Sequence, residues 1–349
     1  MFKLNNYTIT EINTLSALDM VPYHLTGVNT LYAQGISGNG VKVAVVDTGC
    51  DWNHPALTNN IVEKEFNMCG YGGGSMDDQG HGTHVASTIV ELAPSCEVVP
   101  YKVLNPMWGE DSWLLAALEH ISNRDDIDVV NMSLSGELVI DSAAYIMLHS
   151  VIKKLVAKNI FVVVASGNTG AETQLFPACF EEVTTVGAVD LNKNVALFST
   201  SSNHVDVCQV GVNLVGAKLG GGYVKYSCTS MATPMVAGIA ALLIGKYKEQ
   251  HNGVRPDGRL IHHMLRLFAV DMGVKGLDKN SGAGFISLNL NACVQEFVIG
   301  EKSMRVNGKE IILDVAPFIQ ENRTFVPVRY ANYGKFIDWN KDSKTITIV

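Results

Sequence analysis

The stretch VKVAVVDTGCD occupies residues 41–51 and becomes polar at Asp47. Residues 41–46 predict a buried β-strand, because a short run rich in β-branched apolar residues is typical of a strand covered on both faces. Asp47 would stand at the carboxyl end of that strand, before a Thr-Gly turn. The segment therefore predicts an interior strand that places a carboxylate at one edge of a sheet.

The same pattern recurs along the chain in both directions from this stretch. We predict further strands at 98–104, 129–132, 160–165 and 183–189, and helices at 81–93, 113–121, 145–157 and 231–247. Such alternation predicts an α/β fold, a mainly parallel sheet with helices on both faces. Functional side chains gather at the carboxyl ends of strands in these sheets. Asp47 and Asn168 both follow apolar strands, which indicates that they share one cleft.

Composition excludes several classes of protein. Of the 349 residues 47% are hydrophobic and 17% charged, which argues against a disordered chain or a coiled coil. The net charge is −8 and no run of Lys or Arg occurs, so we expect neither a nucleic-acid partner nor a membrane surface. No apolar run has the length of a membrane span, and residues 1–20 lack a signal-peptide pattern. We expect a cytoplasmic protein.

The seven cysteines predict free thiols rather than disulfides or a metal site. Their number is odd and no CxxC pair occurs, so neither a disulfide framework nor a structural zinc site is expected. We predict no metal ligands and no required cofactor.

Three polar motifs supply the groups that a serine nucleophile needs. They are Asp47-Thr48-Gly49, the segment HGTHVA that begins at His81, and the segment TSMATP that contains Ser230. A serine hydroxyl needs a base within hydrogen-bond reach, and the base needs an acceptor that holds its tautomer. Each residue taken singly also has a purely structural interpretation. Asp47 would be a turn residue, His81 a residue at the start of a helix, and Ser230 an N-cap.

Asn168, in the segment ASGN at 165–168, supplies a fourth group. Its side-chain amide would donate to the oxyanion that forms when a hydroxyl attacks a peptide carbonyl, together with the Ser230 N–H. The alternative for Asn168 is a turn former beside Gly167.

Four motifs in one order, VDTGCD (46–51), HGTHVA (81–86), ASGN (165–168) and TSMATPMVAG (229–238), resemble the subtilisin-like serine proteases over roughly residues 19–292. The missing signal peptide and the DTGCD segment are similar to intracellular members. The resemblance implies a serine endopeptidase with protein or peptide substrates, with Asp47, His81 and Ser230 as the triad and Asn168 in the oxyanion hole.

The resemblance also implies substrate-binding segments. One would pair with the substrate backbone and contains Ser133, Leu134, Ser135 and Gly136. The other would line the pocket for the residue before the cut and contains Ala165, Ser166 and Gly167. Leu175 stands where family members usually carry a small residue, so we expect a shallow pocket. Glu110 and Asp111 would border the cleft and favour basic substrate residues, or else be ordinary loop charges.

Two departures from the family pattern bear on activity and on calcium binding. Cys228 stands where the nucleophile motif usually begins with glycine, and its added bulk lies close to the expected oxyanion site. The segment 90–94 is too short for the usual calcium loop after the histidine helix, so that site is expected to be absent, while another calcium site stays open.

We divide the chain into a short leader (1–18), a catalytic domain (19–296) and a small β-rich accessory domain (297–349). The leader either lies in the cleft and is cut off, or is a frayed terminus. Asn307-Gly308 predicts a hairpin, and residues 324–328 and 344–348 predict strands. The tail resembles the stalk-like domain related to copper amine oxidase N-terminal domains. It would mediate docking or assembly, and its kinship with surface proteins leaves a surface or released form as an alternative location.

Two other functions compete with a general endopeptidase. One is a catalytically weak or inactive binding protein that keeps the fold, which the Cys228 substitution favours. The other is an enzyme that processes only itself.

Overall fold

The structure is a computed structural model. It describes residues 2–3, 8–12, 16–70, 72–106, 108–137, 139–288, 295–298, 300, 303–306, 309–312, 316–320, 323–325, 337–340 and 345–348.

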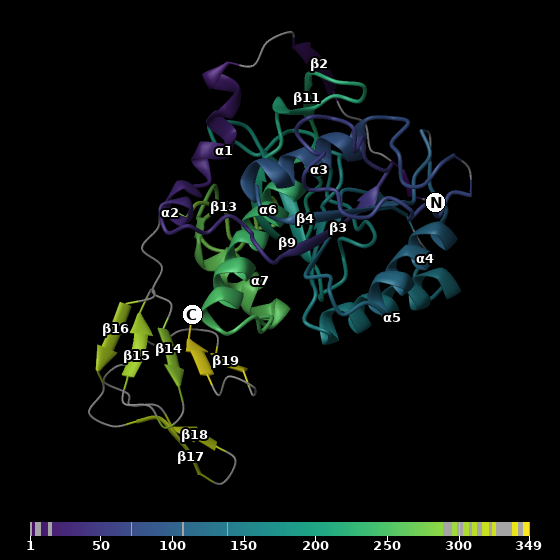
Figure 1. The fold of residues 1–349 in the computed structure, drawn as a ribbon. Helices are drawn as coiled ribbons and strands as arrows, with labels where there is room; N and C mark the ends of the chain where they lie inside the picture. The colour runs from purple at the N-terminus through teal and green to yellow at the C-terminus, as the bar shows by residue number, and fades with distance from the viewer. Residues whose placement is uncertain are drawn as a thin grey trace.

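A central eight-stranded sheet organises the main body (Figure 1). Its order is β12-β13-β9-β8-β7-β5-β3-β4, and every neighbouring pair is parallel except β12 and β13. The strands are β3 (Lys42–Asp47), β4 (Glu97–Lys102), β5 (Val129–Met132), β7 (Phe161–Ala165), β8 (Thr184–Val189), β9 (Val205–Val210), β12 (Ala269–Val270) and β13 (Phe285–Ile286). Each strand predicted in the main body is present, with ends shifted by two residues at most.

Helices cover both faces of this sheet. Alternate β3 residues enter two cores: Val43 and Val45 contact one, and Ala44 and Val46 contact the other. The first core also contains α3 (His81–Leu92) and α6 (Thr229–Gln250), and the second contains α4 (Asp111–Ser122) and α5 (Ala143–Ala157). The predicted α/β class is confirmed. The remaining helical segments are η1 (Ala17–Met20), α1 (Val21–Leu25), α2 (Asn29–Tyr32) and α7 (Gly258–Leu267).

Helix α6 is the core helix of the first layer. Within the described part of the chain it is the one helix long and apolar enough to cross a membrane, and 94% of its apolar window is buried inside the fold. Burial on all sides accounts for an apolar helix without an amphipathic pattern.

Two short leader strands join the main body. β1 (Phe2–Lys3) pairs antiparallel with β6 (Ser135–Gly136). β2 (Thr8–Ile12) pairs antiparallel with β11 (Tyr223–Ser227), which also pairs with β10 (Leu214–Ala217). The leader therefore contacts two segments that are about 90 residues apart in sequence, since residues 135 and 227 both belong to its partners.

The C-terminal strands form two further sheets. One has the order β16-β15-β14-β20-β19, and the other contains β17 and β18. Their bounds are β14 (Gln295–Val298), β15 (Ser303–Val306), β16 (Lys309–Ile312), β17 (Phe318–Gln320), β18 (Arg323–Phe325), β19 (Ile337–Asn340) and β20 (Thr345–Ile348). The predicted hairpin is confirmed, because Val306 pairs with Lys309 across two residues. The domain boundary that we place at 297 falls inside β14, so this sheet already includes Gln295 and Glu296. Of the predicted strand at 324–328, residues 326–328 lie outside the described part.

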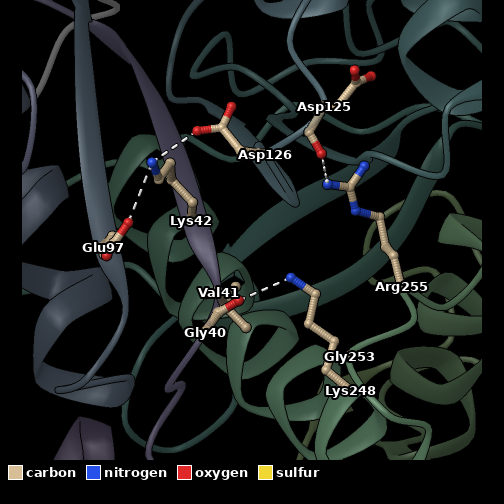
Figure 2. A pocket seen from close by; sticks show the side chains of 9 residues that line it. All are labelled: Gly40, Val41, Lys42, Glu97, Asp125, Asp126, Lys248, Gly253 and Arg255. Atoms are coloured by element: carbon tan, nitrogen blue, oxygen red, sulfur yellow. Dashed lines mark hydrogen bonds and ion pairs between the residues drawn. The ribbon is translucent and has the colours of Figure 1, made fainter.

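A charged cavity of about 480 Å³ lies at the amino ends of β3 and β4 (Figure 2). Lys42, the first residue of β3, forms ion pairs with Asp126 at 2.8 Å and Glu97 at 3.3 Å. Asp47 ends the same strand five residues later, which is roughly 16 Å away along an extended chain. The cavity therefore lies at the opposite edge of the sheet from the predicted cleft.

Buried Asp128 ties together the segments around this cavity. Its carboxylate accepts hydrogen bonds from the Lys42 backbone N–H (2.9 Å), from Lys248 Nζ (2.8 Å) and from Arg255 Nε (2.8 Å). The side chain of Asp128 is 1% exposed, and those of Lys248 and Arg255 are 18% and 17% exposed. One carboxylate thus balances two largely buried cations.

We expect Asp128→Ala to lower the free energy of unfolding by about 3–5 kcal/mol, because it removes the buried carboxylate that pairs with both largely buried cations. Denaturant unfolding followed by circular dichroism measures the change. The matched control is Glu172→Ala, which removes the pair with Lys279 (49% exposed) from a carboxylate that is 59% exposed. That pair should contribute less than about 1 kcal/mol. Equal losses in the two variants would contradict the role of Asp128.

Candidate active site

Asp47 and His81 form a buried pair at the carboxyl end of β3. His81 Nδ1 lies 2.8 Å from Asp47 Oδ1, and the two side chains are 1% and 0% exposed. The same Asp47 oxygen accepts the Thr48 backbone N–H at 2.7 Å. An anionic acceptor on Nδ1 favours the tautomer with its proton on that nitrogen, which leaves Nε2 to act as a base.

A second carboxylate, Asp77, joins the Asp47 turn to the helix that carries His81. Its Oδ1 accepts from Thr48 Oγ1 (2.9 Å) and Gly80 N (3.0 Å), and its Oδ2 accepts from Thr83 N (2.9 Å) and Thr83 Oγ1 (2.6 Å). Asp77 thus satisfies amides at the start of α3, where a negative charge is also favoured by the helix dipole. The position of His81 therefore depends on Asp77 and Thr48.

Gly82 permits the close approach of α3 to the Asp47 turn. A Cβ at this position would lie 2.1 Å from the Gly49 carbonyl oxygen and 3.1 Å from Asp47 Oδ1. Both are backbone or rigidly held atoms, so a side chain would push His81 away from its partner. The small residue after His81 is therefore required by packing.

Opposing effects act on the pKa of His81. Burial lowers it, while the charge and hydrogen bond of Asp47, and then those of Cys228, raise it, and the net result is a pKa above the ordinary value of 6.5. Cys228 precedes Ser230 by two residues, so the start of α6 contributes to the electrostatic environment of His81.

We expect kcat/KM to rise with pH through a limb above pH 6.5, since His81 accepts a proton only when it is uncharged. Cys228→Gly removes one of the groups that raise this pKa, so the limb should move to lower pH.

The stability of the fold should change with pH in the opposite direction. The charged Asp47–His81 pair stabilises the fold fully below pH 6.5, and this stabilisation is lost as pH rises through the higher folded pKa of His81.

A pH series of kcat/KM with one chromogenic peptide measures the limb in both proteins. Cys228→Ala serves as the control for added backbone freedom, because it removes the sulfur and keeps a Cβ. A limb that stays in place in both variants would contradict the contribution of Cys228.

Ser230 is the second residue of α6 and is 2% exposed. Pro234, four residues later, has no N–H to donate to the Ser230 carbonyl. Ser133 Oγ donates to that carbonyl instead, at 2.9 Å. The start of α6 thus holds Ser230 with its backbone carbonyl fixed by Ser133.

Asn168 presents an unpaired amide near the start of α6. Its Oδ1 accepts from Thr229 N (2.8 Å) and Thr229 Oγ1 (2.9 Å). Because a backbone N–H must face an oxygen, this contact determines which end of the amide is which. Asn168 Nδ2 is buried and, within the described residues, has no partner. Since the Ser230 N–H is also among the first amides of a helix, which lack intrahelical acceptors, two donors are available for an anion.

The predicted substrate segments lie around this site. Ser133 follows β5, Ser135 and Gly136 form β6, and residues 165–167 end and follow β7. Gly136 N and O each exchange a hydrogen bond with Phe176 at 2.9 Å. Leu134 is 1% exposed and packs in the second core, so its side chain is structural and only its backbone can face a substrate.

Leu175 fills the space beside Gly167. It is 5% exposed, and a Cβ added to Gly167 would lie 2.3 Å from Leu175 Cδ1.

Glu110 is the N-cap of α4 and Asp111 is the first residue of this helix, where acidic groups interact favourably with the helix dipole. The start of α4 therefore accounts for these two acidic residues without any contact to a substrate.

In the described part of the chain no group of three or more His, Cys, Asp or Glu side chains is placed to hold a metal ion.

Sequence reasoning missed three positioning residues: Thr48, Asp77 and Thr229. Thr48 and Thr229 stand inside motifs quoted in the sequence analysis, and Asp77 lies four residues before His81. Asp77 is three residues before Gly80, the N-cap of α3, so the usual preference for acidic N-cap residues does not identify it. No local signal identifies Thr229 either, because its contact to Asn168 spans 61 residues.

The chain matches known proteins in two separate regions. The family described as "Subtilase family" matches residues 38–284, and that described as "Copper amine oxidase N-terminal domain" matches residues 265–348. The first match covers more than half of the chain.

Individual relatives agree with this. An "Intracellular serine protease" of Paenibacillus polymyxa is 37% identical over 224 residues, which is 59% of this chain and 67% of the relative. "Subtilisin E" of Bacillus subtilis (strain 168) is 38% identical over 248 residues, 65% of this chain and 62% of the relative. A solved structure titled "Crystal Structure of a Lanthipeptide Protease" superposes with a TM-score of 0.71 at 24% identity, covering 78% of this chain and 93% of the other, which is a likeness of fold.

Proposed function

The chain belongs to the subtilase family of serine endopeptidases, and from that premise we propose that it hydrolyses peptide bonds through an acyl-enzyme on Ser230. The observation that carries the proposal is the buried 2.8 Å contact between His81 Nδ1 and Asp47 Oδ1 beside the start of α6. It supports a histidine that a carboxylate holds in the tautomer a general base needs. The accessory domain supplies docking or assembly, and, as the name of the Paenibacillus relative suggests, the site of action is intracellular.

The reaction proceeds in two halves. Ser230 Oγ attacks the carbonyl carbon while its proton passes to His81 Nε2, and the carbonyl oxygen becomes an oxyanion held by Ser230 N–H and Asn168 Nδ2. His81 then gives the proton to the leaving amine and the C–N bond breaks. Water repeats the sequence on the ester and releases the acid. Asp47 stays ionised and stabilises the imidazolium, so the chain's own residues supply each step and no cofactor is needed.

Labelling with a fluorophosphonate tests this function directly, because the reagent reacts with an activated serine. Modification of Ser230 in the native chain and none in Ser230→Ala is the expected result. An unlabelled native chain that still binds peptides would favour the inactive binding protein instead.

The leader supports self-processing as a second activity. A substrate strand would pair antiparallel with β6, and β1 already pairs there, with Phe2 opposite Gly136 and Lys3 opposite Ser135. Further along, Thr8 pairs with Ser227, three residues before Ser230. The leader also occupies the strand position that a substrate requires.

Mass spectrometry of the purified chain tests self-processing. Loss of the first few residues from the native chain, with an intact terminus in Ser230→Ala, is expected. Intact termini in both proteins would show that the leader binds in the cleft without being cleaved, which contradicts self-processing.

We expect Leu175→Gly to shift cleavage toward larger residues before the cut, by about tenfold or more in relative kcat/KM. The physical reason is that Leu175 Cδ1 occupies the space next to Gly167. A cleavage-site profile on a peptide library measures the preference. Leu175→Ile, which keeps the volume, is the control and should leave the preference unchanged. An unchanged profile in Leu175→Gly would show that the pocket is shaped elsewhere.

A further inference from the structure

A lysine is buried next to the strand end that carries Asp47. Lys102 is the last residue of β4, and it is paired in register with Asp47 at the end of β3, the neighbouring strand (Figure 1). Lys102 is 1% exposed. Lysine is almost never fully buried unless its charge is paired, because removing an ammonium group from water is costly. A cation at this position therefore needs stabilising partners.

The ammonium group of Lys102 joins two loops that come from different parts of the chain. Its Nζ donates to the Thr48 carbonyl oxygen at 2.9 Å and to the Met76 carbonyl oxygen at 3.3 Å. It also forms an ion pair with Asp78 Oδ1 at 2.6 Å. One buried cation thus links the end of β4 to the turn after β3 and to the loop before α3.

The contact with Thr48 fixes the backbone next to Asp47. Thr48 directly follows Asp47, and its Oγ1 accepts from the Gly82 N–H at 2.9 Å, so the same residue also holds the start of α3. A shift of the Thr48 backbone would therefore move the Asp47 carboxylate relative to the His81 ring. Lys102 opposes such a shift by holding the Thr48 carbonyl.

The other two contacts of Lys102 fix the loop that carries Asp77. Met76 and Asp78 stand on either side of Asp77 in the sequence. The Asp77 carboxylate accepts from amides at the start of α3, the helix that His81 begins. Because Lys102 holds both neighbours of Asp77, it limits how far this carboxylate can move relative to β3.

We propose that Lys102 is a positioning residue for the Asp47–His81 pair, in which one buried ammonium group keeps the turn after Asp47 and the loop around Asp77 in a fixed arrangement. The inference rests on the proposed peptidase function. Since Lys102 acts through the residues that it holds, its loss should slow the chemical step and leave substrate binding intact.

Lys102→Met tests the proposal, because methionine keeps an unbranched side chain of similar length and removes the charge and the N–H donors. We expect kcat to fall about 100-fold with KM within about twofold of the native value, since a small displacement of a catalytic group is costly even when the peptide still binds. Steady-state kinetics with a fluorogenic peptide measure both constants.

Lys42→Met is the matched control. Lys42 is also a largely buried lysine of the central sheet, with ion pairs to Asp126 and Glu97, but it begins β3 at the edge opposite the site (Figure 2). Its loss removes a comparable charge without touching the turn after Asp47. We expect this variant to keep the native kcat and KM.

Proton NMR reports on the Asp47–His81 hydrogen bond without any need for turnover. A proton held between a histidine Nδ1 and a carboxylate resonates far downfield of the amide protons, and it is visible only while its exchange with water is slow. We expect this resonance in the native chain and in Lys42→Met, with its assignment given by its loss in His81→Ala. In Lys102→Met it should be broadened or lost.

A folded Lys102→Met variant with the native kcat and an unchanged resonance would overturn the proposal. A change confined to KM, or an equal loss of kcat in Lys42→Met, would overturn it as well. If the native chain cleaves no peptide, the peptidase function fails instead. The resonance then still tests Lys102, and its retention in Lys102→Met contradicts the positioning role.

Asp78→Ala provides the test if circular dichroism shows that Lys102→Met does not fold. It removes one acceptor of Lys102 from a side chain that is 40% exposed, so the fold should persist. We expect kcat to fall about threefold with KM unchanged and the resonance to broaden, because the cation keeps only part of its anchoring. Native values of kcat and an unchanged resonance in this variant would overturn the proposal.

Discussion

Ser230→Ala is expected to lower kcat by about 10⁶-fold, because it removes the only atom that forms the acyl-enzyme. The Asp47–His81 pair would remain, since its 2.8 Å contact does not involve Ser230. The fold would remain too, because Ser133 binds the Ser230 backbone carbonyl and not its side chain. Stopped-time assays with a fluorogenic peptide measure the loss.

Two controls make this result specific. The circular dichroism spectrum and the unfolding midpoint should match those of the native chain, and the variant should still bind peptide with an affinity close to the native KM. Residual turnover within about tenfold of the native rate would refute Ser230 as the nucleophile, since losing a covalent route costs far more. If Ser230 is the nucleophile, His81→Ala should lower kcat about as much as Ser230→Ala does. The double variant should lower kcat little further, because the two residues act as one unit.

Asn168→Leu is expected to lower kcat by about 100- to 1000-fold with KM nearly unchanged. The structure gives the reason: Thr229 holds Asn168 Oδ1 by two hydrogen bonds, and the buried Nδ2 has no partner within the described residues. A buried donor without an acceptor is costly, and the developing oxyanion supplies the acceptor only in the transition state.

Thr229→Val is the matched control for Asn168→Leu. It removes the Oγ1 donor at 2.9 Å and keeps the backbone N–H donor at 2.8 Å, so Asn168 stays oriented by one bond and the loss should be smaller. A large rise in KM for Asn168→Leu, with kcat preserved, would place Asn168 in ground-state binding and contradict its oxyanion role.

The four catalytic candidates were accessible to sequence reasoning because each lies in a short motif with its own local cause. Asp47 ends an apolar strand, His81 and Ser230 start helices, and Asn168 follows a strand. The shallow pocket was also predicted from Leu175, and the hypothesis is supported because a Cβ added to Gly167 would lie only 2.3 Å from Leu175 Cδ1.

Other features depend on pairings that leave little trace in local sequence. β9, β10 and β11 were not predicted, and neither was the pairing of β2 with β11, whose partners are more than 200 residues apart. The effect of Cys228 on the pKa of His81 likewise joins the starts of two helices from distant parts of the chain. Local periodicity reports which face of an element is buried, and not which other element buries it.

The sequence by itself determined the order of strands and helices, the α/β class and the residue types available for acyl transfer, because apolar periodicity and short polar motifs act within a few residues. Only the tertiary structure decided how those residues are held: His81 against Asp47 across 34 positions, Asn168 against Thr229 across 61, and Ser133 against Ser230 across 97. Hydrogen bonds at such separations require the packed sheet and helices to bring the partners together first, since no local preference of the chain can place two distant side chains within 3 Å.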